Sequence, residues 1–95
     1  MANKQHLNLI KQGIAYWNHW RDQYPNTMPD LSRADLSGTY MVGANLKGVN
    51  FFGSNLEAAN LSRADIEGAY FRGAKLDAAI MPNGQTYDLT AASEF

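Results

Sequence analysis

A large apolar residue recurs at every fifth position through the middle of the chain. Between residues 31 and 81, the other four registers contribute only Phe52 and Ile80 to the Leu, Ile, Met and Phe residues. Such regular spacing is not expected by chance, so the pattern predicts one continuous repeat whose large residues form the core. The eleven residues in register are Leu31, Leu36, Met41, Leu46, Phe51, Leu56, Leu61, Ile66, Phe71, Leu76 and Met81.

Two further positions of the repeat carry a consistent residue type. The position two before each large residue, from residue 34 on, is small: Ala34, Thr39, Ala44, Val49, Ser54, Ala59, Ala64, Ala69, Ala74 and Ala79. Asp or Asn often stands directly before the large residue, and Gly often stands two after it. Both residue types are typical of tight turns.

A period of five fits neither regular helix nor flat strand. On an α-helix, five residues advance the chain by about 140° net, so the large residues would spiral around the axis. On a strand, an odd step alternates the two faces. The large residues can all point inward only if the chain turns a corner in each repeat. Repeated corners predict a coil, and stacked coils form a solenoid.

The motif A-(D/N)-L-x-x resembles the pentapeptide-repeat family, in a small member of cyanobacterial type. It occurs at residues 34–36, 44–46, 59–61 and 64–66, within a repeat that runs from about Pro29 to Asn83. The resemblance implies an all-β solenoid, namely a right-handed quadrilateral parallel β-helix. With twenty residues per coil, the eleven repeats give about 2.75 coils, a stack roughly 13–15 Å tall.

An internal duplication leaves the number of sides open. Residues 31–41 read LSRADLSGTYM and residues 61–71 read LSRADIEGAYF, which is a period of thirty. Three sides per coil would place Tyr40 and Tyr70 in one column, whereas four sides would place them on opposite faces. The sequence does not distinguish three sides from four, and the expectation of four sides is what the resemblance to the family implies.

Residues 1–28 are predicted to form a capping helix and a linker. Asn3 is a plausible N-cap, and Tyr24 before Pro25 disfavours continuation of the helix. We expect the apolar face to cover the open end of the first coil. The polar face is only weakly basic, so a membrane-surface or partner-binding helix is the weaker alternative. The apolar face comprises Leu7, Ile10, Ile14, Trp17 and Tyr24, with Trp20 beside it.

The β-helix is assigned to residues 29–83 and a tail or partial cap to residues 84–95. The turn sequence at residues 81–84, MPNG, breaks the repeat. Tyr87 and Leu89 are candidates to fold over the last coil, and residues 91–95 are expected to fray. The far end is therefore expected to be only partly covered, which leaves room for association there.

Composition and charge argue against several classes of function. The net charge is −1, with both signs scattered along the chain, which argues against a nucleic-acid partner. The absence of cysteine excludes disulfides and thiolate metal sites. No segment is apolar enough to span a membrane, and no signal peptide is recognisable, so we expect a cytoplasmic protein without a membrane partner.

No catalytic, cofactor or metal site is predicted, and no small-molecule substrate. His6 and His19 are the only histidines and have metal-ligand spacing with no other residue, so exposed or capping roles are expected. Asp35 and Asp65 share their repeat position with Asn, which indicates a hydrogen-bonding role in turns. The glycines follow the repeat and form no phosphate-binding motif.

The predicted function is that of a non-catalytic structural or protein-interaction module. Tyr40, Phe52, Tyr70 and Ile80 point outward and form the candidate interaction surface, and self-association or a protein partner is expected there or at the C-terminal end. The alternative, suggested by one branch of the family, is a DNA-mimicking inhibitor of gyrase. That role implies a long acidic rod, whereas residues 29–83 hold six acidic and five basic residues.

Overall fold

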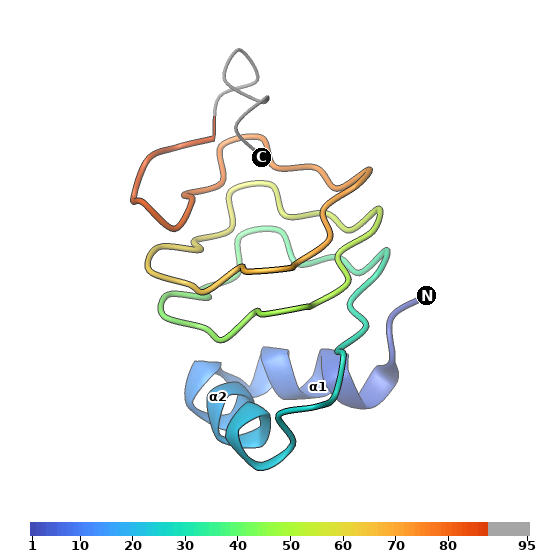
Figure 1. The fold of residues 1–95 in the computed structure, drawn as a ribbon. Helices are drawn as coiled ribbons and strands as arrows, with labels where there is room; N and C mark the ends of the chain where they lie inside the picture. Colours follow the sequence, from blue (N-terminus) through green and yellow to red (C-terminus); the bar gives the residue numbers. More distant parts are fainter. Residues whose placement is uncertain (88–95) are drawn as a thin grey trace.

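Two helices lie beneath a stack of coils in the computed structural model, which describes residues 1–87 (Figure 1). Helix α1 spans Lys4–Gln12 and helix α2 spans Ile14–Gln23. A short link leads from α2 into the first coil, and the coils then rise away from the helices (Figure 1). Leu89 and residues 91–95, for which covering and fraying roles are predicted, lie outside the described residues.

Each coil is twenty residues long. Seven parallel bridges join residues twenty apart, which corresponds to four pentapeptides and hence four sides per coil. The thirty-residue duplication does not set the stacking. Within residues 1–87, β-pairing takes the form of single-residue bridges, because each side is too short for a longer strand between two turns. The parallel bridges are Asp30–Asn50, Asp35–Asn55, Tyr40–Asn60, Asn45–Asp65, Asn50–Tyr70, Asn55–Lys75 and Asn60–Ile80.

The corners are tight turns that begin at the large inward residue. The carbonyl of Leu31, for example, accepts from the N–H of Ala34 at 3.3 Å, and Phe51 accepts from Ser54 at 3.0 Å. In the ten turns that begin at Leu31 to Leu76, only the third residue has a positive φ, as in a type II turn. Glycine fills this position six times, and other residues fill it four times: Arg33, Ala58, Arg63 and Ala78, with φ between 57° and 62°.

The Asp and Asn side chains hold the turns that follow them. The Oδ1 atom of each accepts from the N–H two residues on, as Asp35 does from Ser37 at 3.2 Å and Asp65 does from Glu67 at 3.1 Å. This contact confirms the turn role predicted from the exchange of Asp and Asn at one position. The same bond is made by Asp30, Asn45, Asn50, Asn55, Asn60 and Asn83.

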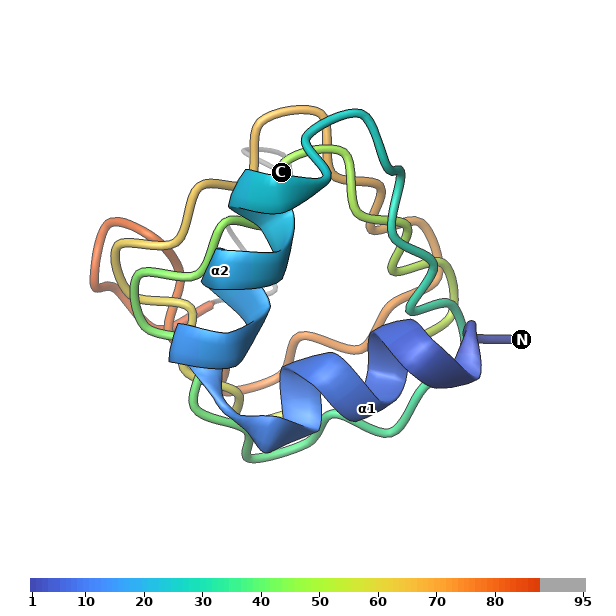
Figure 2. The ribbon, with the colours of Figure 1, turned by 90° about the horizontal axis from the view of Figure 1, so that it is seen from below.

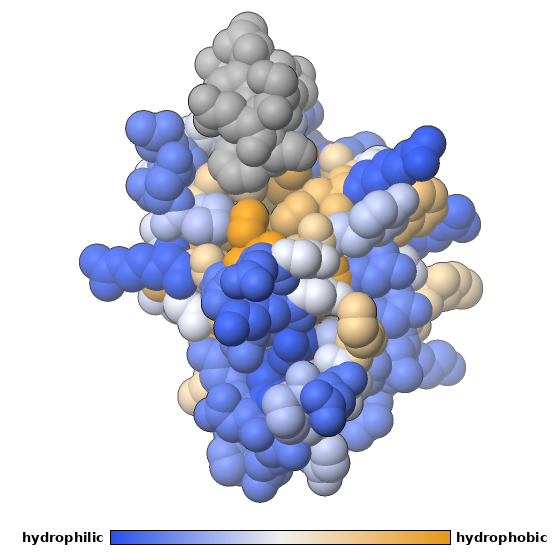
Figure 3. Space-filling model, in the orientation of Figure 1, coloured by the Kyte–Doolittle hydropathy of each residue, from blue (hydrophilic) through white to orange (hydrophobic). Residues whose placement is uncertain are grey.

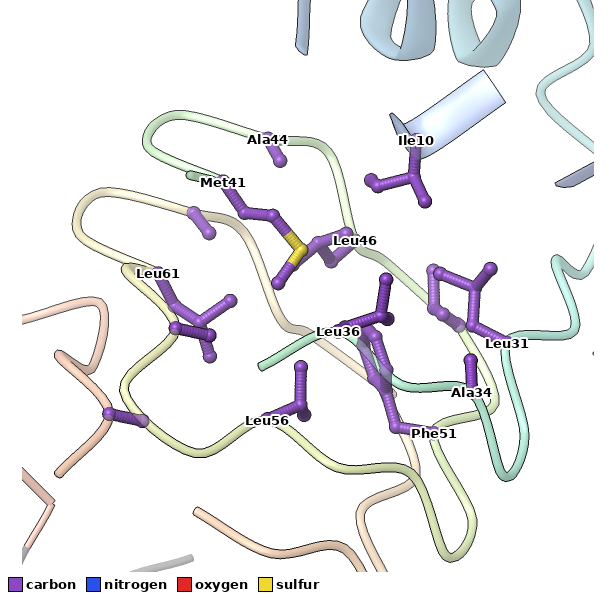
Figure 4. Packing of buried hydrophobic residues seen from close by; sticks show 14 of the residues in the cluster. Ile10, Leu31, Ala34, Leu36, Met41, Ala44, Leu46, Phe51, Leu56 and Leu61 are labelled. Atoms are coloured by element: carbon purple, nitrogen blue, oxygen red, sulfur yellow. The ribbon is translucent and has the colours of Figure 1, made fainter. Parts of the chain in front are cut away.

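The large residues of the repeat stack in columns inside the coils (Figure 4). The rings of Phe51 and Phe71, one coil apart, are parallel within 8° with centroids 5.1 Å apart. Nine of the eleven large residues are buried. The exceptions, Ile66 and Phe71, are half-buried and lie at the upper edge, where the described residues place no further coil above them. The core is therefore complete at the helix end and less complete at the other.

The predicted single helix is wrong, because Gly13 breaks it. Gly13 adopts φ 129° and ψ 161°, and α1 and α2 follow two edges of the first coil (Figure 2). A straight helix of twenty residues would span about 30 Å, whereas five extended residues span at most about 17 Å. The bend keeps both helices over the coil. Tyr24, expected on the apolar face, lies beyond the end of α2 and is 56% exposed.

Candidate functional site

The two edges of a coil differ in their hydrogen-bonding groups. Between the first two coils, Leu46 donates its N–H to the carbonyl of Asp65 at 2.8 Å, and Gly48 donates to Glu67 at 2.9 Å. One bond runs the other way, from the N–H of Asp65 to the carbonyl of Ala44 at 3.0 Å. Each side thus presents two N–H groups and one carbonyl at its upper edge, the edge away from the helices. Its lower edge presents two carbonyls and one N–H.

The same polarity recurs at the next step of the stack. Phe51 donates to Tyr70 at 2.8 Å and Gly53 donates to Arg72 at 3.0 Å. Leu56 and Ala58 donate upward in the same way, to Lys75 and Asp77, while Lys75 donates downward to Ser54. A stack of such coils therefore ends in an acceptor-rich lower edge and a donor-rich upper edge, and each requires a different partner.

Helix α2 completes the lower edge on the side of Asn45. Trp17 donates its Nε1–H to the carbonyl of Asn45 at 2.8 Å, and Nη2 of Arg21 donates to the carbonyl of Lys47 at 2.7 Å. The N–H of Asn45 donates to Oδ1 of Asn18 at 2.8 Å. Two donors and one acceptor thus occupy the positions that the upper edge of a coil would supply. Three helical side chains reproduce the hydrogen-bonding groups of a missing coil.

Helix α1 and the residue before it complete the lower edge at Asp30. The N–H of Asn3 donates to the carbonyl of Asp30 at 2.9 Å, and the N–H of Asp30 donates to Nδ1 of His6 at 3.0 Å. Oδ1 of Asn3 also accepts from the N–H groups of Gln5 and His6, so the predicted N-cap is confirmed. This end of α1 both caps itself and binds the first coil.

The acceptor role of His6 requires an unprotonated Nδ1. The ring is 9% exposed and packs against Trp20 with centroids 5.0 Å apart. Burial lowers the pKa of His6 below its usual value; the negative charge of Asp30 opposes this shift, and the positive charge of Arg21 adds to it. The surroundings of His6 therefore favour the neutral imidazole that the hydrogen bond from Asp30 needs.

Arg21 is almost entirely buried at the same interface. Its side chain is 4% exposed, and burial lowers its pKa from the usual range. Within residues 1–87, Nε and Nη1 have no hydrogen-bond partner. The guanidinium is thus held by the Nη2 bond to Lys47 and by packing, in a role that a hydrophobic residue could not fill.

Apolar contacts also join the helices to the first coil. Ile10 lies between α1 and the side chains of Leu31 and Leu46 (Figure 4), and Trp17 is fully buried in the same cluster. The helix end of the molecule is hydrophilic outside (Figure 3). Both the apolar cross-section and the polar edge of the first coil are thus covered on the sides where the helices lie.

The upper edge of the last coil is not completed in this way. Six N–H groups, two on each of three successive sides, make no hydrogen bond within residues 1–87. The carbonyls on these sides, those of Ala64, Ala69 and Ala74, accept no backbone hydrogen bond within residues 1–87, whereas that of Ala79, on the next side, accepts from the N–H of Tyr87 at 2.6 Å. The six N–H groups belong to Ile66, Gly68, Phe71, Gly73, Leu76 and Ala78.

A hollow of about 480 Å³ lies along this edge, between Tyr70, Phe71, Ala74 and Tyr87. Hydrophobic surface gathers around the upper coil, in contrast to the helix end (Figure 3). Half-buried Phe71 is one of the residues that line the hollow. The upper end therefore combines unpaired backbone donors with apolar side chains, which is the composition of an interaction site.

The four predicted surface residues form two pairs on opposite sides of the stack. Tyr40, which is 69% exposed, shares a column with Ile80 through Asn60. Phe52 stacks on Tyr70, with centroids 6.2 Å apart and an interplanar angle of 18°. The two pairs do not form one patch, because bridging positions 40 and 70 belong to opposite sides of a four-sided coil.

Two contacts on the outer surface were not predicted from the sequence. The ammonium group of Lys47 pairs with the carboxylate of Asp65 at 3.5 Å. The guanidinium of Arg33 lies 5.4 Å from the ring centroid of Phe52, a cation–π contact that adds to the stack on Tyr70. Arg33, Phe52 and Tyr70 thus form one lateral cluster.

The residues that complete the lower edge were mostly missed by the sequence analysis. The sequence pattern places Trp17 on the apolar face of the helix and predicts no contact for Asn18 or Arg21. Their spacing of one and three residues along α2 was the available signal, because polar residues beside an apolar helical stripe reach the surface against which that stripe packs.

Two searches of residues 1–87 for other kinds of site gave negative results. No group of three or more His, Asp or Glu in this part of the chain is placed to hold a metal ion. None of its helices has the length and apolar character that crossing a membrane requires.

Comparison with known proteins identifies the repeat. A family model described as "Pentapeptide repeats (8 copies)" matches residues 30–68 and 54–83. Among solved structures, HetL of the cyanobacterium Nostoc sp. strain PCC 7120, a pentapeptide repeat protein involved in heterocyst differentiation regulation, is similar with a TM-score of 0.56. The two share 37% identity over 61% of this chain and 30% of HetL. No curated protein matches significantly.

Proposed function

Because the chain belongs to the pentapeptide-repeat family, we propose that it is a non-catalytic module that binds a polypeptide partner. The proposed scaffold is the right-handed quadrilateral β-helix, which the twenty-residue spacing of the bridges and the likeness to HetL support. The chain spans 30% of the length of HetL. The shared coil is therefore the basis of the proposal, rather than the regulatory role of the whole relative.

One observation carries the proposal, namely the difference between the ends of the stack. Side chains of α1 and α2 pair with the lower edge on two of its sides, those of Asp30 and Asn45, whereas six N–H groups on three successive sides of the upper edge have no partner within residues 1–87. Unpaired edges of this kind pair readily with another chain. The proposed binding site is accordingly the upper end, around Phe71 and the adjoining hollow.

Lateral binding is the second form of the proposal. The cluster of Arg33, Phe52 and Tyr70 offers aromatic and cationic surface of the kind enriched at protein interfaces. Tyr40 and Ile80 offer less, because they lie on another side and no aromatic ring stacks on them within residues 1–87. We therefore rank the upper end first, the Phe52 cluster second and the Tyr40 column last.

Inhibition of gyrase by DNA mimicry is the alternative that the structure favours least. The repeats hold nearly equal numbers of acidic and basic residues, so no acidic rod is formed. We expect the protein to leave gyrase supercoiling unchanged at micromolar concentration. Clear inhibition would replace the present proposal.

Affinity capture from the native extract tests the proposed site, with the wild-type chain and two variants as bait. Phe71→Asp places a charge at the upper end, and Tyr40→Ser is the matched lateral control. The proposal predicts a protein that is retained by the wild type and by Tyr40→Ser and is lost with Phe71→Asp. Retention by all three baits would contradict a binding site at the upper end.

A further inference from the structure

The hydrogen-bonding groups at the upper end specify the kind of partner. We propose that this end binds the carbonyl-rich lower edge of a pentapeptide coil from a different polypeptide, and that a second copy of this chain does not fit. The inference rests on the proposed function and adds the identity of the partner class.

Complementarity between edges is the first argument. Each of the three exposed sides presents two N–H groups, those of Ile66 and Gly68 on the first of them. A partner must therefore bring two carbonyls for every N–H, at intervals of five residues. The lower edge of a pentapeptide coil has this composition, as the pairing of Leu46 and Gly48 with Asp65 and Glu67 demonstrates within the chain.

The helices show that the chain follows this rule where it completes an edge itself. At the lower edge, two donors and one acceptor come from Trp17, Arg21 and Asn18, which complement the groups of that edge one for one. The described residues offer no corresponding set of acceptors above the last coil. Only the backbone N–H of Tyr87 and the bridge between Ile80 and Thr86 extend the pairing there.

A second copy of the chain is a poor occupant. Its lower edge is already paired with α1 and α2 at Asp30 and Asn45, so head-to-tail stacking is blocked on those sides. Two upper edges face to face would set twice six N–H groups against twice three free carbonyls. Half of the donors would then lose water without gaining an acceptor of their own, which is unfavourable.

Side chains at the same end fit an incoming coil as well. Ile66 and Phe71 are half-buried and end their inner columns, so a further large residue above each would complete the core. The hollow on this edge is lined by Arg72 and by no carboxylate. A partner coil with Asp or Glu above this side would match it in charge.

The test is a nuclear magnetic resonance titration of the isotope-labelled wild-type chain. The probe is unlabelled full-length chain carrying Trp17→Ala, which loosens α2 and frees the lower edge at Asn45 and Lys47. We expect the amide signals of Ile66, Phe71 and Leu76 to shift on addition of this probe. Should Trp17→Ala fail to fold, Arg21→Ala, which frees the carbonyl of Lys47 and retains the buried Trp17 ring, is the probe.

Two controls and the solution mass complete the experiment. Unlabelled wild-type chain, and a Leu56→Ala chain with an intact cap, should produce no shift, and light scattering should show a wild-type monomer at all concentrations. The inference is overturned if the folded probe shifts none of the three signals, or if the wild type self-associates through this end. If capture still depends on Phe71 while the probe does not bind, the docking function stands and only the partner class is wrong.

Discussion

At the scale of single residues, the turn position with positive φ distinguishes residues that suit the fold from residues that it strains. Gly38, Ala58 and Ala78 occupy one column of this position, with φ of 66°, 59° and 62°. Only glycine adopts such values without a steric penalty, and alanine there costs about 1–2 kcal/mol. The column therefore contains one relaxed residue and two strained ones in equivalent surroundings.

We predict that Ala58→Gly stabilises the protein by about 0.5–1 kcal/mol, because relief of the strain outweighs the greater chain entropy of glycine in the unfolded state. Gly38→Ala should destabilise by about 1–2 kcal/mol. No atom lies within 4 Å of a Cβ built at Gly38, so that loss would come from the backbone alone. Urea denaturation measures both, and a loss of stability in Ala58→Gly would contradict the account.

The environment of His6 predicts a dependence of stability on pH. Its pKa is lowered in the folded state from an ordinary value of 6.5, so between the two values the unfolded chain binds more protons. Stability should therefore be constant above about pH 7 and should fall as the pH drops through 6.5 toward the lowered value. The carboxyls of Asp30 and Asp35, whose pKa values lie below 3.8, contribute only at lower pH.

Thermal unfolding between pH 5 and pH 8 tests this prediction. His6→Gln, which keeps a side-chain acceptor but does not titrate, should flatten the profile in this range. His19→Gln is the matched control, since His19 is exposed and makes no hydrogen bond or ring contact within residues 1–87. A profile that depends on His19, or that persists in His6→Gln, would be inconsistent with the role assigned to the His6 ring.

At the scale of elements, the direction of the stability change caused by Gly13→Ala distinguishes the predicted single helix from the observed pair of helices. Inside a continuous helix, Gly13→Ala would stabilise by about 1 kcal/mol. In the structure Gly13 has φ 129° and ψ 161°, a region that is open essentially to glycine alone. We therefore predict that Gly13→Ala destabilises by about 1–3 kcal/mol in chemical denaturation. Stabilisation would support the straight helix.

The break at Gly13 could not be predicted from helical periodicity. Leu7, Ile10, Ile14 and Trp17 have the same spacing in one helix as in two, so the pattern gives no sign of a bend. The bend follows from the width of the coil that the two helices cover, because a straight helix would extend beyond it. By contrast, the turn role of Asp35 and Asp65 was predictable, because it depends on groups only two residues apart.

At the scale of the whole molecule, the depth of packing changes along the stack. Leu56 is fully buried in the middle of the stack, whereas Ile66 at the upper edge is only half-buried. We predict that Leu56→Ala costs about 2–5 kcal/mol and that Ile66→Ala costs about 1 kcal/mol. Equal losses, measured by urea denaturation, would indicate that the upper end is as well packed as the middle.

The repeat, its register and its inward residues could be predicted from the sequence, because large residues at a period of five share one side only if the chain turns a corner in every repeat. The number of sides could not, since both three and four satisfy this condition. The polarity of the coil edges could not be predicted either. The polarity of the edges depends on which backbone groups of Leu46, Gly48 and Asp65 point along the stack. The type of a residue does not reveal the direction of its backbone N–H and carbonyl groups. For the same reason, the sequence does not show that the side chains of Trp17, Asn18 and Arg21 replace the hydrogen-bonding groups of a missing coil.

Amide hydrogen exchange, resolved by residue, tests the central claim most directly. Leu46, Phe51 and Leu56 donate their N–H groups to a coil above, and Ile66, Phe71 and Leu76 hold the same repeat position without an acceptor within residues 1–87. For the isolated chain, the account predicts strong protection of the first three amides and exchange of the last three at least ~100-fold faster. Equal protection of both sets in a monomer would contradict the open, donor-rich end on which the proposed function depends.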